Sequence, residues 1–247
     1  MIIYKSPKEI EKIRAAGSIV NKTLKLLFEN LKPGATTQKL DGIAEEYIKS
    51  QGAVPSFKGY NGFPGSICVS IDDEVVHGIP GPRIIREGQI VGIDVGVFKN
   101  GYHGDAACTF PVGDIDDPDK ELMKIGEECL LKGIEKARLG NRIGDIGQAI
   151  QDHAEKHGYS VVRDLVGHGI GKKLHEEPQV PHYGKAGTGL ELKLGLVIAI
   201  EPMINAGDFQ VRIRDDNWTI VTADGKRSVH FEHTIAITEN GPKVLTK

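Results

Sequence analysis

The sequence predicts a mixed fold of the α/β or α+β class in a single domain spanning residues 1–247. Helix-like segments alternate along the chain with short apolar runs typical of strands. No linker or low-complexity segment interrupts this alternation, and 247 residues are enough to bury one large core. One helix-and-strand pattern also occurs twice, which indicates an internal repeat.

Four helices are expected from their start signals and apolar spacing. Ser6-Pro7-Lys8-Glu9 is a capping box with proline at the first helical position, so the first helix begins there. Pro33-Gly34 ends that helix, and a second helix follows over residues 35–51. Asp117-Pro118 begins a third helix, and a fourth runs from about Ile143 to His157.

The remaining apolar runs predict strands. They span residues 66–70, 89–98, 102–112, 159–166, 195–204, 210–221 and 229–237. In the repeat, helix 35–51 matches helix 141–157 at an offset of 106 residues, and the strand at Asp94 matches the strand at Glu201 at an offset of 107. We therefore expect two related halves that pack with pseudo-twofold symmetry and bring these two acids face to face. The halves are about 1–113 and 114–247.

The composition is that of an ordinary globular protein, with 39% hydrophobic and 26% charged residues. A net charge of -3 disfavours a nucleic-acid-binding role. The three scattered cysteines form neither a disulfide framework nor a zinc-ribbon spacing. No stretch is long enough to span a membrane, and the first residues are unlike a signal peptide. We expect a cytoplasmic protein with no specific nucleic-acid partner and no membrane partner.

Acidic side chains occur inside segments that should be buried. Asp94 interrupts one apolar run, Glu201 ends another, and Glu232 lies within a third. An unpaired carboxylate in such a strand costs on the order of several kcal/mol. A shared cation is the tolerable way to keep such acids buried, so the pattern predicts a metal centre.

The segment around Asn100-Gly101 places two aspartates together, because Asn-Gly is the strongest two-residue signal for a hairpin with a type I′ turn. With this turn, Asp94 lies opposite Ala107 and Asp105 lies opposite Gly96. The two aspartates are then diagonal neighbours on one sheet face, with Cα atoms roughly 7–8 Å apart. Their carboxylates can lean over ions about 3.5–4 Å apart, as two-metal hydrolases require. The small residues Gly96 and Ala107 are expected to leave room for these ions.

His168 completes the candidate ligand set, because it lies in a glycine-rich run that allows close approach of the backbone. The set combines four carboxylates with one imidazole and contains no thiolate: Asp94, Asp105, His168, Glu201 and Glu232. Such donors suit Mn²⁺, Fe²⁺, Co²⁺ or Mg²⁺ more than structural zinc. Four negative charges balance two dications, and five ligand residues leave positions open for water and substrate. We expect two divalent metal ions with a hydroxide between them.

Five short motifs carry a family resemblance. They are Val76-His77-Gly78-Ile79-Pro80, Gly167-His168-Gly169-Ile170-Gly171, His175-Glu176-Glu177-Pro178, Ile200-Glu201-Pro202-Met203 and Glu232-His233-Thr234. In this order and spacing they resemble the motifs of the type I methionine aminopeptidases, and the resemblance extends almost from end to end. It implies the pita-bread fold, in which pseudo-symmetric halves with a curved antiparallel sheet are flanked by helices.

The resemblance also implies residue roles. The five ligand residues would bind the ions, with Asp105 and Glu232 bridging them. His77 and His175 would contact the substrate, and Glu201 would move a proton from the attacking hydroxide to the leaving amine. A methionine pocket would be lined by Phe57, Tyr60, Phe63, Cys68 and Trp218. Leu174 replaces an aromatic residue that the family often has there, so one pocket wall should differ in shape.

We therefore expect a metal-dependent enzyme that removes N-terminal methionine from peptides and nascent polypeptides, using cobalt, manganese, iron or a similar metal. Such an enzyme could also touch the ribosome transiently. An X-Pro aminopeptidase or prolidase of the same fold is an alternative that shares all five ligands, but those enzymes generally carry an extra N-terminal domain, and this chain starts at its first catalytic-fold helix. A non-catalytic interaction module of the same fold should have lost ligands, and here all five are present.

Overall fold

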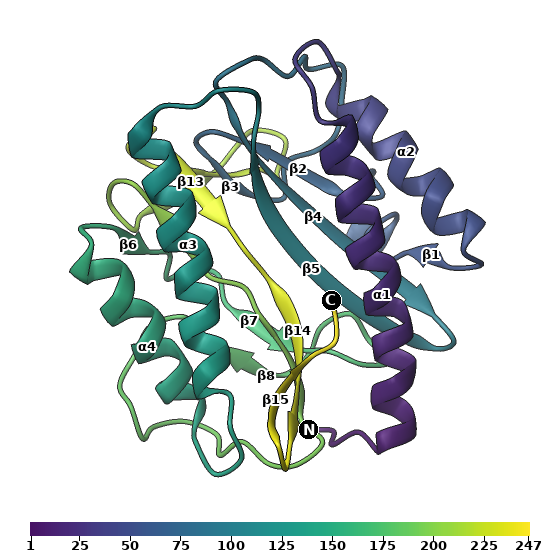
Figure 1. Ribbon diagram of the computed structural model, residues 1–247, viewed down its shortest axis with the longest axis vertical. Coiled ribbons are helices and arrows are strands. Elements are labelled where there is room, and N and C mark those ends of the chain that lie inside the picture. Colours follow the sequence, from purple (N-terminus) through teal and green to yellow (C-terminus); the bar gives the residue numbers. More distant parts are fainter.

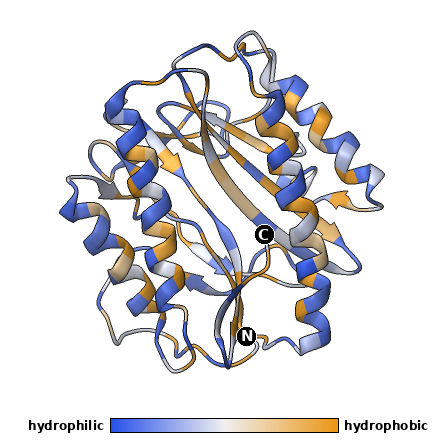
Figure 2. Cartoon of the chain, in the orientation of Figure 1, coloured by the Kyte–Doolittle hydropathy of each residue, from blue (hydrophilic) through white to orange (hydrophobic).

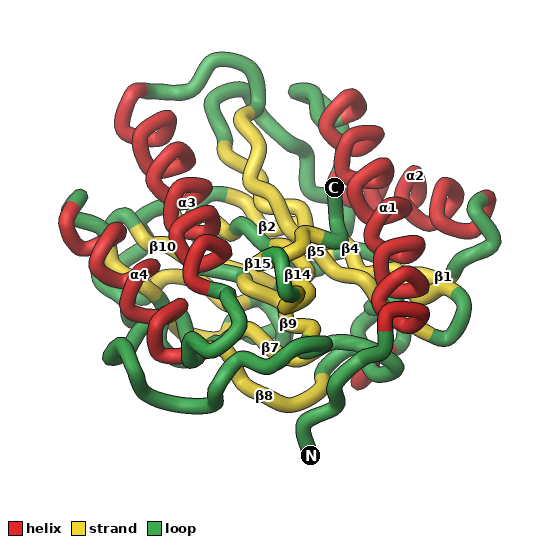
Figure 3. Tube along the Cα trace, turned by 60° about the horizontal axis from the view of Figure 1, so that its bottom comes forward, coloured by secondary structure: helices red, strands yellow, loops and turns green.

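Two pairs of helices flank a set of antiparallel sheets in the computed structural model, which describes residues 1–247 (Figure 1). On one side lie α1 (Pro7–Asn30) and α2 (Thr37–Ser50), and on the other lie α3 (Asp117–Lys136) and α4 (Ile143–Lys156). The same arrangement is visible when the molecule is turned, with the strands between the helix pairs (Figure 3). The predicted mixed fold is therefore confirmed.

Capping residues set the helix boundaries. The backbone amide of Glu9 donates to the Ser6 hydroxyl, and the Ser6 amide donates to the Glu9 carboxylate, so the predicted capping box begins α1. Asp116 caps α3 in the same way, by accepting from the amide of Asp119. Figure 2 shows hydrophobic and hydrophilic residues alternating around the helices, as expected where one face is buried. None of these helices combines the length and apolarity that crossing a bilayer would take.

A long hairpin forms the core of the first sheet. Its strands are β4 (Ile90–Lys99) and β5 (Tyr102–Pro111), joined by Asn100 and Gly101 with φ of 53° and 84°. Positive φ at both central residues is what a type I′ turn requires. The register pairs Asp94 with Ala107 and Gly96 with Asp105, so the predicted hairpin is confirmed. The opposite edge of β4 pairs with β1 (Val54–Pro55) and β2 (Cys68–Ile71).

The second sheet has five strands in the order β15-β14-β9-β7-β8. Their bounds are β7 (Gly167–Gly169), β8 (Glu176–Val180), β9 (Val197–Ile200), β14 (His233–Thr238) and β15 (Gly241–Val244). Two smaller sheets have the orders β13-β10-β6 and β11-β12-β3. Their bounds are β3 (Glu74–Val76), β6 (Ser160–Val161), β10 (Met203–Asn205), β11 (Val211–Ile213), β12 (Ile220–Thr222) and β13 (Ser228–His230). A single 3-10 turn, η1 (Tyr60–Gly62), lies between β1 and β2.

Two predicted strands are broken where the chain passes from one sheet into another. The run 195–204 divides into β9 and β10 at Glu201-Pro202, and the run 229–237 divides into β13 and β14 at Phe231-Glu232. The prediction of continuous strands there is wrong. Ile200 pairs with His233 before the break and Met203 pairs with His230 after it, so the register is kept across the gap. The two glutamates therefore lie across from each other, outside the regular ladders.

The two helix pairs match in detail. Both α2 and α4 have 14 residues, and each is preceded by a glycine with positive φ, Gly34 at 90° and Gly140 at 86°. Two hydrophobic clusters of similar size, 23 and 20 buried residues, lie against α3 and α4 and against α1 and α2. Each helix pair therefore covers a core of its own. These matches support the proposed duplication, and the limits of the halves and the single catalytic domain stay predictions.

Candidate metal centre

The five predicted ligands come from four places in the chain and line one cavity. Asp94 lies on β4 and Asp105 lies on β5, on the same face of the hairpin. Glu201 and Glu232 lie at the two strand breaks, and His168 is the central residue of β7. The structure thus brings together residues that are up to 138 positions apart in the chain, from Asp94 to Glu232.

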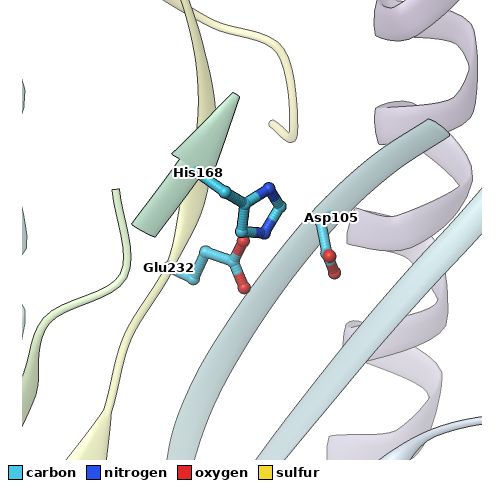
Figure 4. A group of neighbouring side chains, drawn as sticks. All are labelled: Asp105, His168 and Glu232. Carbon is cyan, nitrogen blue, oxygen red and sulfur yellow. The ribbon is translucent and has the colours of Figure 1, made fainter. Parts of the chain in front are cut away.

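Three of these side chains already have the spacing of metal ligands. Asp105, His168 and Glu232 each offer one donor atom, and the three atoms lie within 4.8 Å of one another (Figure 4). Figure 4 shows their side chains directed into the same space from three separate segments. Glu201 joins this group, because its Oε1 lies 3.4 Å from Nε2 of His168.

Hydrogen bonds between β5 and the β13–β14 segment hold the aspartates and the glutamates together. The amide of Asp105 donates to the Thr234 hydroxyl, which in turn donates to the carbonyl of Asp105. The amide of Glu232 donates to the carbonyl of Ala107 at 2.9 Å. The segments carrying Asp105 and Glu232 are therefore joined by backbone contacts, so the distance between these carboxylates does not depend on the side chains alone.

The four carboxylates are incompletely hydrogen-bonded within the protein. One oxygen of each is buried without a hydrogen bond: Asp94 Oδ1, Asp105 Oδ1, Glu201 Oε1 and Glu232 Oε1. Burial raises the pKa of Asp94 to about 7. Burial, followed by repulsion from Glu232 and Asp94, raises the pKa of Asp105 well above its usual range. Burial and the neighbouring acids have the same effect on the pKa of Glu201 and of Glu232. A buried group of acids that repel one another calls for a cation at its centre.

His168 is prepared to bind such a cation through Nε2. Its Nδ1 lies 2.9 Å from the carbonyl oxygen of Gly169, which can only accept, so we assign the ring proton to Nδ1. Burial, with His175 nearby, lowers the pKa of His168 to about 3, which keeps the ring neutral. The Nε2 lone pair therefore faces the carboxylates. Four oxygen donors, one neutral imidazole and four unpartnered buried oxygens fit divalent metal ions.

Two spaces meet at this centre. A cavity of about 210 Å³ is lined by the five ligands and by Phe57, Tyr60, Phe63, Cys68 and Trp218. A larger groove of about 720 Å³ opens to solvent between an apolar wall, Val76, Leu165, Val166 and Met203, and a charged one that includes Lys172 and Lys173. His77, His168, His175 and Glu201 border both spaces. The centre therefore lies in the smaller pocket, next to the larger groove.

The two predicted substrate-contacting histidines lie at this junction. Nδ1 of His175 lies 2.8 Å from the hydroxyl of Tyr60, and its ring meets the His168 ring edge to face at 4.2 Å. His77 has a φ of 61°, a left-handed conformation that is uncommon for a residue with a Cβ. Burial, with His175 nearby, lowers the pKa of His77 to about 4. Tyr60 and His168 thus contact the His175 ring, and the backbone of His77 is set in an uncommon conformation.

The expectation that Gly96 leaves room for the metal ions is wrong. A Cβ at this position would come within 2.6 Å of the Phe57 ring, so the ring occupies the space that was expected to leave room for ions. Leu174 lines the same pocket, as expected from the sequence. Phe63 and Trp218 meet edge to face with ring centroids 5.2 Å apart. The small residue at 96 thus makes room for the Phe57 ring, which lines the pocket.

Sequence reasoning missed two buried histidines. Nε2 of His182 accepts the amide of Glu201 at 3.1 Å, so it fixes the backbone at that ligand. His230 lies with its Nε2 3.8 Å from Oε2 of Glu201 and has no other partner. His230 could have been noticed, because it precedes Glu232 by two residues in the same run. His182 carries no local signal, since only the fold places it behind Glu201.

Comparison with known proteins places these features in a family. The model of metallopeptidase family M24 matches residues 11–239. Methionine aminopeptidase 1 of Bacillus subtilis is 56% identical over 247 residues, which cover 100% of both chains. A methionine aminopeptidase of Clostridium perfringens is 54% identical over 246 residues, covering 100% of this chain and 99% of the relative.

Solved structures agree in fold. The crystal structure of methionine aminopeptidase from Rickettsia prowazekii superposes with a TM-score of 0.99 at 44% identity, covering 100% of both chains. A prolidase from Pyrococcus horikoshii superposes with a TM-score of 0.82 at 28% identity, and this chain covers 64% of it. This chain is thus more similar in length, sequence identity and shape to these methionine aminopeptidases than to the prolidase.

Proposed function

The chain belongs to metallopeptidase family M24, and on this premise we propose that it is a metal-dependent hydrolase that removes methionine from the N-terminus of peptides and nascent polypeptides. Relatives that are more than half identical over its full length are methionine aminopeptidases. The prolidase is only 28% identical and extends well beyond this chain. The X-Pro alternative is therefore the weaker one, and the retained ligands argue against a non-catalytic module.

One observation carries the proposal: the ligands line a small pocket of about 210 Å³ that borders a larger groove of about 720 Å³. A small pocket beside the ligands suits one terminal side chain, as an exopeptidase needs, and the larger groove has room for the rest of the polypeptide. The pocket is lined by aromatic rings and the Cys68 thiol. An unbranched thioether suits such a wall, since sulfur–aromatic contacts contribute about 0.3–1.5 kcal/mol.

We further propose that the centre binds two divalent ions, which Asp94, Asp105, His168, Glu201 and Glu232 would hold. Four carboxylates carry the charge that two dications neutralise, and each of them has an oxygen without a protein partner. Bound ions would supply Lewis acidity for the substrate carbonyl and an activated water as nucleophile near neutral pH. The metal would be cobalt, manganese, iron or a similar ion, all of which suit oxygen-rich donor sets.

The histidines act on the scissile amide. With the Tyr60 hydroxyl donating to Nδ1 of His175, the ring proton lies on Nε2 and can be donated to an oxygen that becomes negative. Burial lowers the pKa of His175, so it acts as a neutral hydrogen-bond donor. His77, which also lines the cavity and has a left-handed backbone conformation, would contact the same bond.

Glu201 moves the proton. Its Oε1 is buried without a hydrogen bond, and burial with the neighbouring aspartates raises its pKa well above the usual range. With ions bound, the Glu201 carboxylate would be ionised and could accept a proton from the attacking water and pass it to the leaving amine. The hydrogen bond from its amide to His182 keeps the residue in place while it does so.

The experiment that tests this function is methionine release from a Met-Ala-Ser peptide by the purified chain. We expect release with added Mn²⁺ or Co²⁺, loss of release with excess chelator, and recovery when a single kind of ion is restored. An Ala-Pro dipeptide assayed in parallel should remain intact. Cleavage of Ala-Pro without methionine release would assign the X-Pro activity instead, and no hydrolysis with any ion would refute both.

Contact with the ribosome and a cytoplasmic location stay predictions made from the sequence.

A further inference from the structure

A lysine is buried beside the segment that carries His175. Lys5 lies in the chain before α1, and its side chain is only 2% exposed. Its Nζ donates to Oε2 of Glu176 at 2.6 Å and to the carbonyl of Ile3 at 3.0 Å. The Glu176 side chain is 3% exposed, so both charges of this pair are removed from water. A buried pair of this kind is costly unless its geometry is good and its remaining hydrogen bonds are made.

The pair is part of a larger anchor. The Lys5 amide donates to the carbonyl of Gly195 at 2.7 Å, which ties the N-terminal segment to the chain before β9. Glu176 also accepts the amide of Lys173 through Oε1. A Cβ on Gly171 would lie 2.6 Å from Lys5 Cε and 2.7 Å from Glu176 Oε1, so the backbone there is packed directly against the ion pair. Both ends of the segment 171–176 are therefore held by the same two side chains.

This segment carries His175, whose ring must be in place for the chemistry. His175 directly precedes Glu176, and Gly169, which follows the ligand His168, pairs with Glu176 across β7 and β8. The N-terminal segment passes next to β8 in Figure 3, and its residues Met1 and Ile3 form part of the groove wall. The His175 ring itself has one hydrogen-bond partner, the Tyr60 hydroxyl. A small shift of β8 would move the ring away from it.

We propose that Lys5 is a positioning residue for His175: by pairing with Glu176 it fixes the segment 171–176, and with it the imidazole that donates to the scissile amide. The proposal rests on the proposed function for its effect on turnover. The pair lies outside the metal ligands, and Lys5 does not line the groove, although Glu176 does. Its contribution is geometric, since misplacing a catalytic group by about 1 Å can cost on the order of 10²-fold in rate.

Turnover of Met-Ala-Ser by Lys5→Met tests the proposal. We expect kcat to fall by about 10- to 100-fold, while KM stays within a few-fold because the methionine pocket is untouched. Lys5→Arg keeps the charge and the reach, so it should recover most of the loss. Glu176→Gln should resemble Lys5→Met, and the double variant should be no slower than either single variant, because both changes break one interaction. The matched control is Lys243→Met, which breaks an exposed pair between Lys243 and Glu11 and should leave kcat unchanged.

Circular dichroism at the assay temperature separates folding from positioning, and Glu176→Gln serves if Lys5→Met does not fold. A second reading is independent of turnover: the ¹⁵N chemical shifts of the His175 ring should change in Lys5→Met and in Glu176→Gln but not in Lys243→Met. Normal kcat in folded Lys5→Met, multiplying losses in the double variant, or unchanged ring shifts would overturn the proposal. An inactive wild type with ring shifts that still respond would instead refute the proposed function and leave the positioning role in place.

Discussion

Replacing Asp94 with asparagine should stabilise the metal-free protein, although it removes a proposed ligand. Asp94 is a buried acid whose Oδ1 has no hydrogen-bond partner. Without a cation the folded chain must either bury its negative charge or keep the group protonated. Asparagine has nearly the same shape and no charge, so it avoids that cost at every pH.

The size of the effect follows from the pKa. Burial raises the pKa of Asp94 from 3.8 to about 7, and each pH unit corresponds to about 1.36 kcal/mol, which gives about 4 kcal/mol. Because the folded pKa lies above the unfolded one, this cost develops as the pH rises from about 4 to about 7. The gain from Asp94→Asn is therefore complete above about pH 7 and absent below about pH 4. For a protein of this length it corresponds to a rise of about 8–16 °C in Tm.

The assay is thermal unfolding of both proteins with excess EDTA and with saturating Mn²⁺, at pH 5 and pH 8. In EDTA the variant should be the more stable, by a wider margin at pH 8. With Mn²⁺ the variant's advantage at pH 8 should shrink by up to about 2.7 kcal/mol, because an ion at 100 times its Kd adds that much to a protein with the full ligand set and less to one that lacks a ligand.

Asp145→Asn is the matched control with the opposite sign. Hydrogen bonds from the amides of Arg142 and Gly187 lower the pKa of Asp145, so its negative charge is favoured in the folded state. The same substitution there should lower Tm at pH 8, with or without metal. An Asp94→Asn variant that is less stable than wild type in EDTA at pH 8 would refute the reasoning, since it would mean that the acid is satisfied without a cation.

Asp105→Asn should weaken Mn²⁺ binding by at least about tenfold and lower kcat in parallel; equilibrium dialysis and the peptide assay check both, and full activity in metal-limited buffer would contradict the role. His77→Ala should lower kcat by about 10²-fold or more while metal content by elemental analysis stays normal; loss of metal would make it a ligand. Trp218→Ala should raise KM for Met-Ala-Ser by about tenfold, equivalent to about 1.4 kcal/mol of lost pocket contact, and an unchanged KM would remove it from the pocket. Burial lowers the pKa of His182 to about 3, so stability should be lost as the pH falls below about 6.5, where the unfolded imidazole takes up a proton; His182→Gln should flatten that slope, and parallel curves would exclude this cause.

Local chemistry explains which parts of the fold could be predicted. Asn100-Gly101 specifies its turn through two positive φ angles, and the turn in turn sets the register that places Asp94 and Asp105 on one face. Ser6 and Glu9 specify the start of α1 in the same local way. In each case the deciding contact lies within a few residues, so the pattern in the sequence contains it.

Contacts between distant segments could not be predicted in this way. The strand breaks at Glu201 and Glu232 arise because each of these two segments passes from one sheet into another. A run of apolar residues in the sequence does not reveal that passage. The space over Gly96 belongs to Phe57, which is far along the chain from it. The pair between Lys5 and Glu176 joins residues 171 positions apart. The candidate site residues were predicted from the sequence, by the energetic cost of acids in buried strands and by family resemblance, whereas the contacts that support them were visible only in the fold.

The breaks at Glu201 and Glu232 also explain why the acids can be kept at all. In a continuous ladder, both glutamates would be paired strand residues with side chains fixed alternately on either face. At the breaks the backbone is freed from that alternation, while the matching registers on both sides keep the two residues opposite each other. Asp94 and Asp105, in contrast, stay inside regular strands, where the pleat already puts them on the same face. One pair of acids is thus set by a regular hairpin and the other by an interruption shared by two strands, and the two pairs face one cavity. A cation is what makes this arrangement stable, so metal binding and the native packing of the centre should be lost together.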